Sequence, residues 1–260
     1  MKRAVSGARV SAMLVAGIGV SMAVVAACTE IPTDPKAVLS LAVDTLPAPA
    51  VVLGDSLRDS AGVARAVTVT AFNFQGEVIE DAVVRFSTRD RGIDVDSITG
   101  FVIGDSVRST PARVTARVGG VEALLLIDVT LRPDSVAGVT TRDSLSYSLT
   151  DTAVNVSPIL SVKVLHGILG DSVVKSYIVS FAVASPPATA LARLVNDAGR
   201  ASRIDTTDAS GVAGRKIRID PSRMTSLNDS VIVFATVKHR GLQVRGSPVR
   251  MVMKLKPKSP

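Results

Sequence analysis

Residues 63–74, VARAVTVTAFNF, alternate apolar and polar side chains over much of their length. Val67, Val69 and Ala71 fall on one side of an extended chain, and the two threonines between them fall on the other, because successive side chains of a strand point to opposite faces. β-Branched residues suit such a half-buried, pleated surface. The segment therefore predicts a β-strand with one face in a core.

Further segments with strand character recur along the rest of the chain. They are residues 83–87, 98–103, 112–118, 122–131, 159–165, 173–183, 188–195, 212–219, 231–237 and 249–255. Hydrophobic residues make up 47% of the sequence, aromatic residues only 3%, and Trp is absent. Because Gly, Asp, Ser and Pro separate the apolar runs and helix signals are scarce, the sequence predicts an all-β fold.

The two halves of the chain resemble each other. Residues 76–86 (GEVIEDAVVRF) match residues 170–181 (GDSVVKSYIVSF), since each pairs a turn glycine with a strand that ends in Phe. Residues 114–118 (VTARV) likewise match residues 233–237 (VFATV). A repeat of this length predicts two tandem β-sandwiches.

The RPDS sequence at residues 132–135 separates the halves, because proline and turn-forming residues follow a long apolar segment. We expect one Ig-like sandwich over residues 37–133. A second Ig-like sandwich with a short basic tail is expected over residues 134–260.

Residues 74–86 resemble the G-x-x-V-x-x-a-x-V-x-F hairpin of bacterial Ig-like domains, with Ile79 in the place of Val. Residues 207–213 (TDASGVA) are similar to the T-D-x-x-G-x-A turn of the same family, which leads into a strand. These domains occur in invasin- and intimin-type adhesins and in surface lipoproteins. The resemblance implies a sandwich and an exposed location but no chemistry. The first half departs from it, because RSTPA at 108–112 stands where the turn motif is expected.

The N-terminus has the pattern of a lipoprotein signal peptide over residues 1–27. Basic residues precede an apolar run that ends in Ala26-Ala27-Cys28, and Cys28 is the only cysteine of the chain. The end of the run resembles a bacterial lipobox, which implies cleavage between Ala27 and Cys28, acylation of Cys28 (palmitate among the chains), and a tether over 28–36. Thr29 favours the outer membrane. The alternative is an uncleaved membrane helix.

Charge is distributed unevenly. The chain carries a net charge of +7, but residues 28–198 are acidic on balance and residues 199–260 are basic. If the basic residues lie on outward strand faces, they form a positive surface that faces away from the acidic first half. The residues in question are Arg203, Arg215, Arg218, Lys238, Arg240, Arg245 and Arg250. The partners that such a surface predicts are an anionic glycan, lipopolysaccharide or a protein, without specific nucleic-acid binding. The alternative is a solvated strand face with a frayed basic tail and no partner.

Residues 51–57 (VVLGDSL) resemble the nucleophile block of GDSL-type esterases, with Ser56 as the nucleophile. Such an enzyme needs a histidine base in a D-x-x-H block, and neither His166 nor His239 stands in one. Gly-Asp-Ser also recurs at 104–106 and at 170–172. The repetition favours a turn, in which Gly adopts positive φ, Asp and Ser bond nearby amides, and the next apolar residue starts a strand.

No cofactor or metal is expected. The aspartates that come nearest to a calcium pattern lack the spacing of a calcium loop. They are Asp94, Asp96, Asp134, Asp143, Asp205 and Asp208. The phenylalanines are expected in the core. The predicted function is therefore a non-enzymatic, lipid-anchored cell-envelope spacer or adhesion module with no assigned ligand site. The alternatives are an accessory subunit that docks by an edge strand and the esterase.

Overall fold

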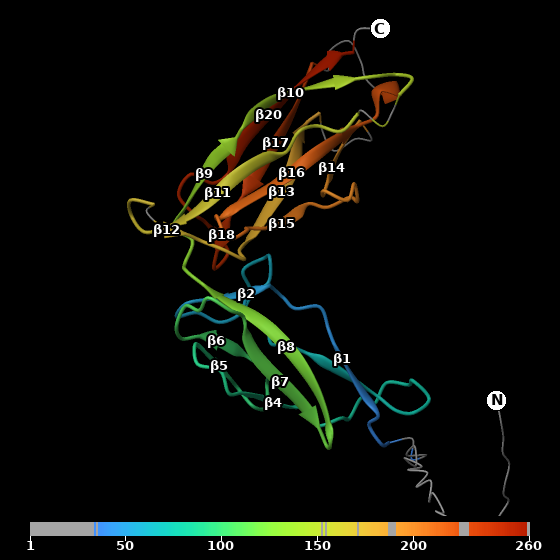
Figure 1. The fold of residues 1–260 in the computed structure, drawn as a ribbon, viewed down its shortest axis with the longest axis vertical. Helices are drawn as coiled ribbons and strands as arrows, with labels where there is room; N and C mark the ends of the chain where they lie inside the picture. The colour runs from blue at the N-terminus through green and yellow to red at the C-terminus, as the bar shows by residue number, and fades with distance from the viewer. Residues whose placement is uncertain are drawn as a thin grey trace, which may run out of the picture. The chain divides into compact units, whose positions relative to one another are not determined.

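The computed structural model describes residues 34, 36–151, 153, 155–170, 172–186, 191–223 and 229–258. All of them belong to one compact unit, Pro32–Pro260. The unit is all-β, as the composition predicts, and Figure 1 shows its strands in two layered groups. The predicted signal peptide and Cys28 lie outside the described residues.

The first group, called the first sandwich, comprises eight strands. They are β1 (Ser40–Val43), β2 (Ala50–Val52), β3 (Val69–Phe72), β4 (Arg85–Thr88), β5 (Ile93–Val95), β6 (Val102–Gly104), β7 (Ala112–Val118) and β8 (Val121–Thr130). Its main sheet has the order β2-β8-β7-β4, and β1–β3 and β5–β6 form two further pairs.

The second group, called the second sandwich, contains the remaining strands. They are β9 (Ser135–Thr140), β10 (Arg142–Tyr147), β11 (Leu160–His166), β12 (Ser172–Val173), β13 (Ile178–Ser185), β14 (Ala192–Val195), β15 (Ile204–Thr206), β16 (Val212–Ile219), β17 (Ser230–Thr236), β18 (Lys238–His239), β19 (Leu242–Gln243) and β20 (Val249–Pro257). One sheet runs β10-β20-β17-β13-β15 and the other β12-β11-β16-β14, with β9 also on β11 and a β18–β19 hairpin. A 3-10 turn, Pro221–Arg223, precedes β17.

The internal repeat predicted from the sequence is present in the strand pairing. Phe86 of β4 pairs with Ala116 of β7, and Phe181 of β13 pairs with Ala235 of β17. Both alanines occupy the third position of the matched five-residue segments. The order β2-β8-β7-β4 therefore corresponds to β10-β20-β17-β13, and in each case the first two strands are parallel.

Each sandwich has its own hydrophobic core. Thirteen positions between Ala48 and Val129 form one cluster of buried residues, and those of the second cluster fall between Val136 and Leu255. The boundary after Pro133 stays a prediction, and the two cores support it. Of the phenylalanines expected in the core, Phe86 and Phe181 are buried and Phe101 is exposed, while Phe72, Phe74 and Phe234 are half-buried.

Three predicted strands are too long. The strand expected over 98–103 is regular only from Val102, because residues 97–99 form a turn in which the Ile98 and Thr99 amides donate to the Asp96 carboxylate. The strand expected over 63–74 is regular only at Val69–Phe72, because Val67, although buried, bonds through its N–H to the Gly100 carbonyl rather than within a ladder. The strand expected over 173–183 is interrupted by Ser176, which has a φ of 54° and donates its N–H to the Thr207 carbonyl. The TDASGVA turn leads directly into β16, as its resemblance implies.

Candidate functional site

The GDSL stretch is a turn between β2 and a buried leucine. Gly54 has a φ of 70°, which glycine adopts without steric cost, and Leu57 is fully buried. The Gly54 N–H donates to the Gly104 carbonyl (2.8 Å), and the Gly104 N–H donates to the Asp55 carbonyl (3.0 Å). The turn expected from the sequence is confirmed, and it places Asp55 at the end of the first sandwich.

Asp55 is a buried carboxylate held by two arginines from different sandwiches. Its side chain is only 5% exposed. Arg58 donates from Nε to Oδ2 (2.9 Å) and from Nη2 to Oδ1 (2.8 Å), which is a bidentate pair. Arg240, 185 residues later in the sequence, donates from Nε to Oδ2 (2.9 Å). One carboxylate therefore links the GDSL turn to the β18–β19 hairpin.

These hydrogen bonds decide the protonation of Asp55. Burial alone would raise its pKa, but the donors of Arg58 and Arg240 and the Ser56 N–H outweigh burial and hold the pKa well below its usual range. His239 lies beside the same carboxylate, with 3.8 Å between Nε2 and Oδ2. Burial lowers the pKa of His239, although the Asp55 charge acts in the opposite direction. Asp55 is therefore ionised throughout the physiological range.

Two glycines make a close backbone contact beside this ion pair. Gly62 has a φ of 86°, and a Cβ built on it would lie 2.3 Å from the backbone nitrogen of Gly241. No side chain larger than hydrogen fits there without displacing the hairpin. We refer to Asp55, Arg58, Gly62, Arg240 and Gly241 together as the joint.

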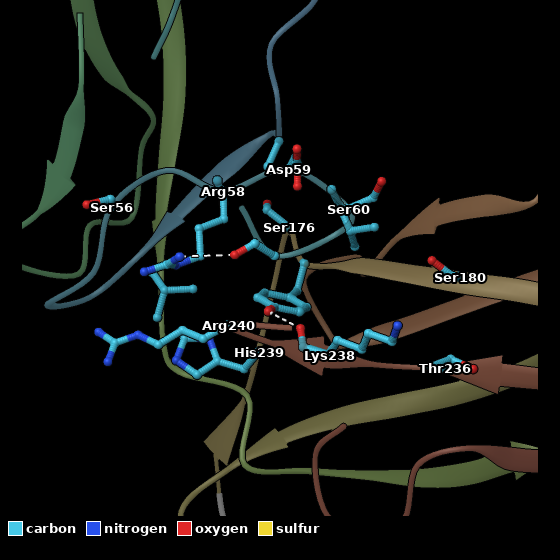
Figure 2. A pocket seen from close by; sticks show the side chains of 16 residues that line it. Ser56, Arg58, Asp59, Ser60, Ser176, Ser180, Thr236, Lys238, His239 and Arg240 are labelled. Atoms are coloured by element: carbon cyan, nitrogen blue, oxygen red, sulfur yellow. Dashed lines mark hydrogen bonds between the residues drawn. The ribbon is translucent and has the colours of Figure 1, made fainter. Parts of the chain in front are cut away.

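A pocket of about 230 Å³ lies at the joint, lined by residues of both sandwiches (Figure 2). Tyr177 closes part of it, with its hydroxyl donating to the Lys238 carbonyl (2.6 Å). Burial raises the pKa of Tyr177, so the phenol stays protonated and remains a donor. Arg58 donates from Nη1 to the Gly62 carbonyl (3.0 Å). Each of these two hydrogen bonds therefore joins residues of a single sandwich and fixes the pocket wall on its own side of the joint.

Three further hydrogen bonds join the same two sandwiches. The Thr130 hydroxyl donates to the Lys175 carbonyl (2.7 Å), and the Ser176 hydroxyl donates to Oδ2 of Asp128 (2.5 Å). Lys175 Nζ donates to the Arg108 carbonyl (3.1 Å). The unusual backbone of Ser176 places its hydroxyl toward the first sandwich.

Ser56 lines the pocket but is not arranged as a nucleophile. Its N–H donates to Oδ1 of Asp55 (2.8 Å), and its hydroxyl makes no hydrogen bond within the described chain. Figure 2 shows that hydroxyl pointing away from His239. His239 faces the Asp55 carboxylate, which two arginines already neutralise. The geometry provides no base for Ser56.

No known protein family matches the sequence. No curated protein sequence matches it either. Among solved structures, domains 4 and 5 of the S-layer protein SbsC align with 83% of this chain and 96% of their own, at 14% identity and a TM-score of 0.30. Human protocadherin-24 EC1-2 aligns with 86% of this chain and 100% of its own, at 10% identity and a TM-score of 0.27. Similarities this weak carry no information about function.

The other two Gly-Asp-Ser copies differ from each other. Gly170 has a φ of 69° and precedes β12, as expected. Gly104 instead ends β6 in an extended conformation, and a Cβ there would lie 2.7 Å from the Val52 carbonyl oxygen. Val107 begins no strand. The prediction of a positive-φ turn at 104–106 is therefore wrong, because this glycine serves close strand approach.

All six aspartates weighed as calcium ligands bond to neighbouring groups. Oδ1 of Asp96 accepts from the Ile98 and Thr99 amides, and Oδ1 of Asp208 accepts from the Ser210 and Val212 amides. Asp94 and Asp143 each accept from the next residue's amide, Asp134 pairs with Arg132 and His166, and Asp205 pairs with Arg215. Within the described residues no three acidic, His or Cys side chains are grouped to hold a metal ion.

The basic residues of the C-terminal quarter do not all face outward. Arg203, Lys238, Arg240, Arg245 and Arg250 are exposed, whereas Arg218 is half-buried. Arg215 is buried, pairs with Asp205 (2.7 Å) and donates to the Gly214 carbonyl (2.8 Å). Arg240 pairs with Asp55 of the first sandwich. The prediction that the basic residues form an outward surface facing away from the first half is therefore wrong for Arg215, which is buried, and for Arg240, which contacts the first sandwich.

The residues that make the joint were not predicted. Asp55 was expected only as a turn residue, and Arg240 only as a surface charge. Only the pair of Asp55 with Arg58 had a local signal in the sequence, because Arg58 follows Asp55 by three residues. The described residues include no helix with the length and hydropathy to span a bilayer.

Proposed function

We propose that this chain is a non-enzymatic, lipid-anchored protein of the cell envelope whose two sandwiches form a spacer or adhesion module with a fixed joint. The observation that carries the proposal is the contact of Gly62 with Gly241 beside the Asp55–Arg240 ion pair. Linked domains usually move relative to each other unless their interface is well made. Here charge pairing, close backbone packing and three further hydrogen bonds act together.

The arrangement suits a mechanical role better than a chemical one. Of the charged side chains that line the pocket, Arg58 and Arg240 are both paired with Asp55, and Asp59 is paired with Arg65. A spacer has to transmit orientation from its anchor to its far end. A joint that cannot rotate without breaking a buried ion pair would do so.

Gly62→Ala is expected to open the joint without unfolding either core. The added methyl group would overlap the Gly241 backbone, so the hairpin must move away. Small-angle X-ray scattering of residues 29–260 should then show a larger radius of gyration than the unchanged protein. Gly76→Ala is the matched control, because Gly76 has a similar φ of 80° but nothing within 4 Å of a built Cβ.

Both variants carry the same backbone strain, about 1 kcal/mol, so a difference in scattering reports the steric contact alone. If Gly62→Ala and Gly76→Ala scatter identically, the joint is not a fixed contact in solution and the spacer proposal is wrong.

The proposed anchor rests on the sequence around Cys28. Cys28→Ala removes the only thiol of the chain, so incorporation of labelled palmitate should fall to background and unprocessed precursor should accumulate. A single acyl chain holds a protein on a membrane only weakly, and several on one residue make a lasting anchor. Label retained by Cys28→Ala would contradict lipidation at this residue.

We further propose an outer-membrane location. An aspartate directly after the lipidated cysteine resembles an inner-membrane retention signal, and this chain has Thr29 at that position. Fractionation of the envelope distinguishes the two membranes. Substitution of Thr29 by Asp should move the protein to the inner membrane.

A further inference from the structure

On one face of the second sandwich, the outward positions of three neighbouring strands carry no acidic residue. In β20 the buried residues Met251, Met253 and Leu255 alternate with residues that point outward. The outward positions are Arg142, Ser144 and Ser146 of β10, Arg250, Val252, Lys254 and Lys256 of β20, and Ser230, Ile232, Phe234 and Thr236 of β17. This face of the three strands therefore combines cations, hydroxyls and half-buried apolar groups.

A groove of about 500 Å³ crosses this face where β10 and β20 lie side by side. It is lined by Arg142, Asp143, Ser144, Arg250, Val252 and Lys254. Asp143, the one acidic residue at its edge, accepts the Ser144 N–H at Oδ1 (2.7 Å). No ion pair joins Arg142, Arg250 or Lys254 to a carboxylate of the described chain. The groove is thus lined by three cations and one carboxylate, which leaves an excess of positive charge.

The strand register brings these cations close together. Arg142 pairs with Val252, so Arg250 and Lys254 stand two residues to either side of it on the neighbouring strand. Like charges at such diagonal positions repel each other and destabilise a sheet. A bound anion would relieve the repulsion.

We propose that this groove binds an anionic polysaccharide. Arg250 and Lys254 are four residues apart along one strand, about 13 Å, and Arg142 lies between them on a strand about 4.8 Å away. A polymer with charged groups at regular intervals can meet all three cations at once. Arginine binds carboxylate, sulfate and phosphate groups through paired N–H donors, and the Ser144 hydroxyl, which lines the groove, is placed to bond a sugar hydroxyl.

Other anionic partners fit the groove less well. Binders of single-stranded nucleic acid stack bases on exposed aromatic rings, but Phe234, the one aromatic residue on these outward positions, is half-buried. Binding to a lipid surface requires large apolar side chains that insert, and no large hydrophobic residue of β10, β17 or β20 is exposed. The proposal does not depend on the joint or on the lipid anchor.

The test is retention of the full chain, in neutral detergent, on immobilised heparin and on alginate. The double substitution Arg250→Gln with Lys254→Gln should weaken binding about tenfold at low salt, since each exposed charge contributes about threefold. Arg193→Gln with Arg200→Gln is the matched control. It removes the same charge from two exposed arginines of the other sheet and its adjoining turn, and should leave retention nearly unchanged.

Each outcome decides the proposal. Three results together support it. Retention falls in the groove double variant but not in the control, Lys254→Gln alone gives an intermediate fall in retention, and rising salt releases the unchanged protein. Equal loss in both double variants would show that net charge alone binds the polymer and would overturn it. Failure of the unchanged chain to bind either polysaccharide, or groove-dependent binding to duplex DNA or phosphatidylserine vesicles in their place, would overturn it as well.

Discussion

Phe181→Ala is expected to lower the free energy of unfolding of the second sandwich by about 3–5 kcal/mol. Phe181, in β13, is 2% exposed and belongs to the core of that sandwich. Truncation to alanine removes its buried apolar surface and leaves a cavity that rigid strands cannot fill. The measurement is urea denaturation followed by tyrosine fluorescence, because Tyr147 and Tyr177, the only tyrosines, both lie in the second half.

Phe86→Ala provides the matched comparison. Phe86 occupies the corresponding place in the first sandwich and is 6% exposed. Its replacement should lower the stability of the first core by a similar amount, visible by circular dichroism, and shift the tyrosine transition much less. Phe101→Ala, at an exposed position, should have little effect on either. Equal shifts of the tyrosine transition in both core variants would contradict two separately packed halves.

Regular strands with one buried face could be predicted from the sequence. Residues 112–118, 212–219 and 231–237 alternate clearly, and their strands match the prediction to within one residue. Burial of one face selects such a pattern, so the pattern reveals the strand. The repeat was visible in the sequence because the matched segments that end in Phe86 and Phe181 share a turn glycine and a similar spacing of apolar residues.

Strands at sheet edges left weaker signals. β10 (RDSLSY) buries only Leu145, so its polar residues resemble a loop, yet its backbone pairs with β20 over six positions. β15 has one isoleucine, which is exposed, and its aspartate pairs with Arg215. Their pairing depends on the neighbouring strand rather than on their own side chains.

The joint could not have been predicted for a related reason. Whether the Asp55 carboxylate bonds only within its own turn or also accepts a hydrogen bond from Arg240 depends on how two segments far apart in the sequence come together. The residues next to Asp55 and Arg240 contain no pattern that predicts this contact. Positive φ at Gly62 is a local property, but its closeness to Gly241 is not. Long-range ion pairs leave no periodic pattern in the sequence.

Asp55→Ala is expected to cost about 3 kcal/mol of stability at neutral pH, since removing one partner of a buried ion pair costs about 3–5 kcal/mol when the remaining charge loses its compensation. The lower end applies here, because Arg240 is 57% exposed and can be rehydrated. Asp197→Ala is the control. It breaks an ion pair with Lys216 in which Asp197 is 81% exposed, and should change stability far less.

The pH dependence of this difference tests the ion pair itself. The pKa of Asp55 is lowered by folding, so its contribution is fully present above the pKa of the unfolded chain, about 3.9, and is lost as pH falls toward the folded value. The stability gap between the unchanged protein and Asp55→Ala should stay constant from about pH 7 to pH 5. Below about pH 4 it should narrow by roughly 1.4 kcal/mol per pH unit. A gap that is independent of pH down to about pH 3, below the unfolded-state pKa, would mean that Asp55 stabilises the fold by packing and not by its charge.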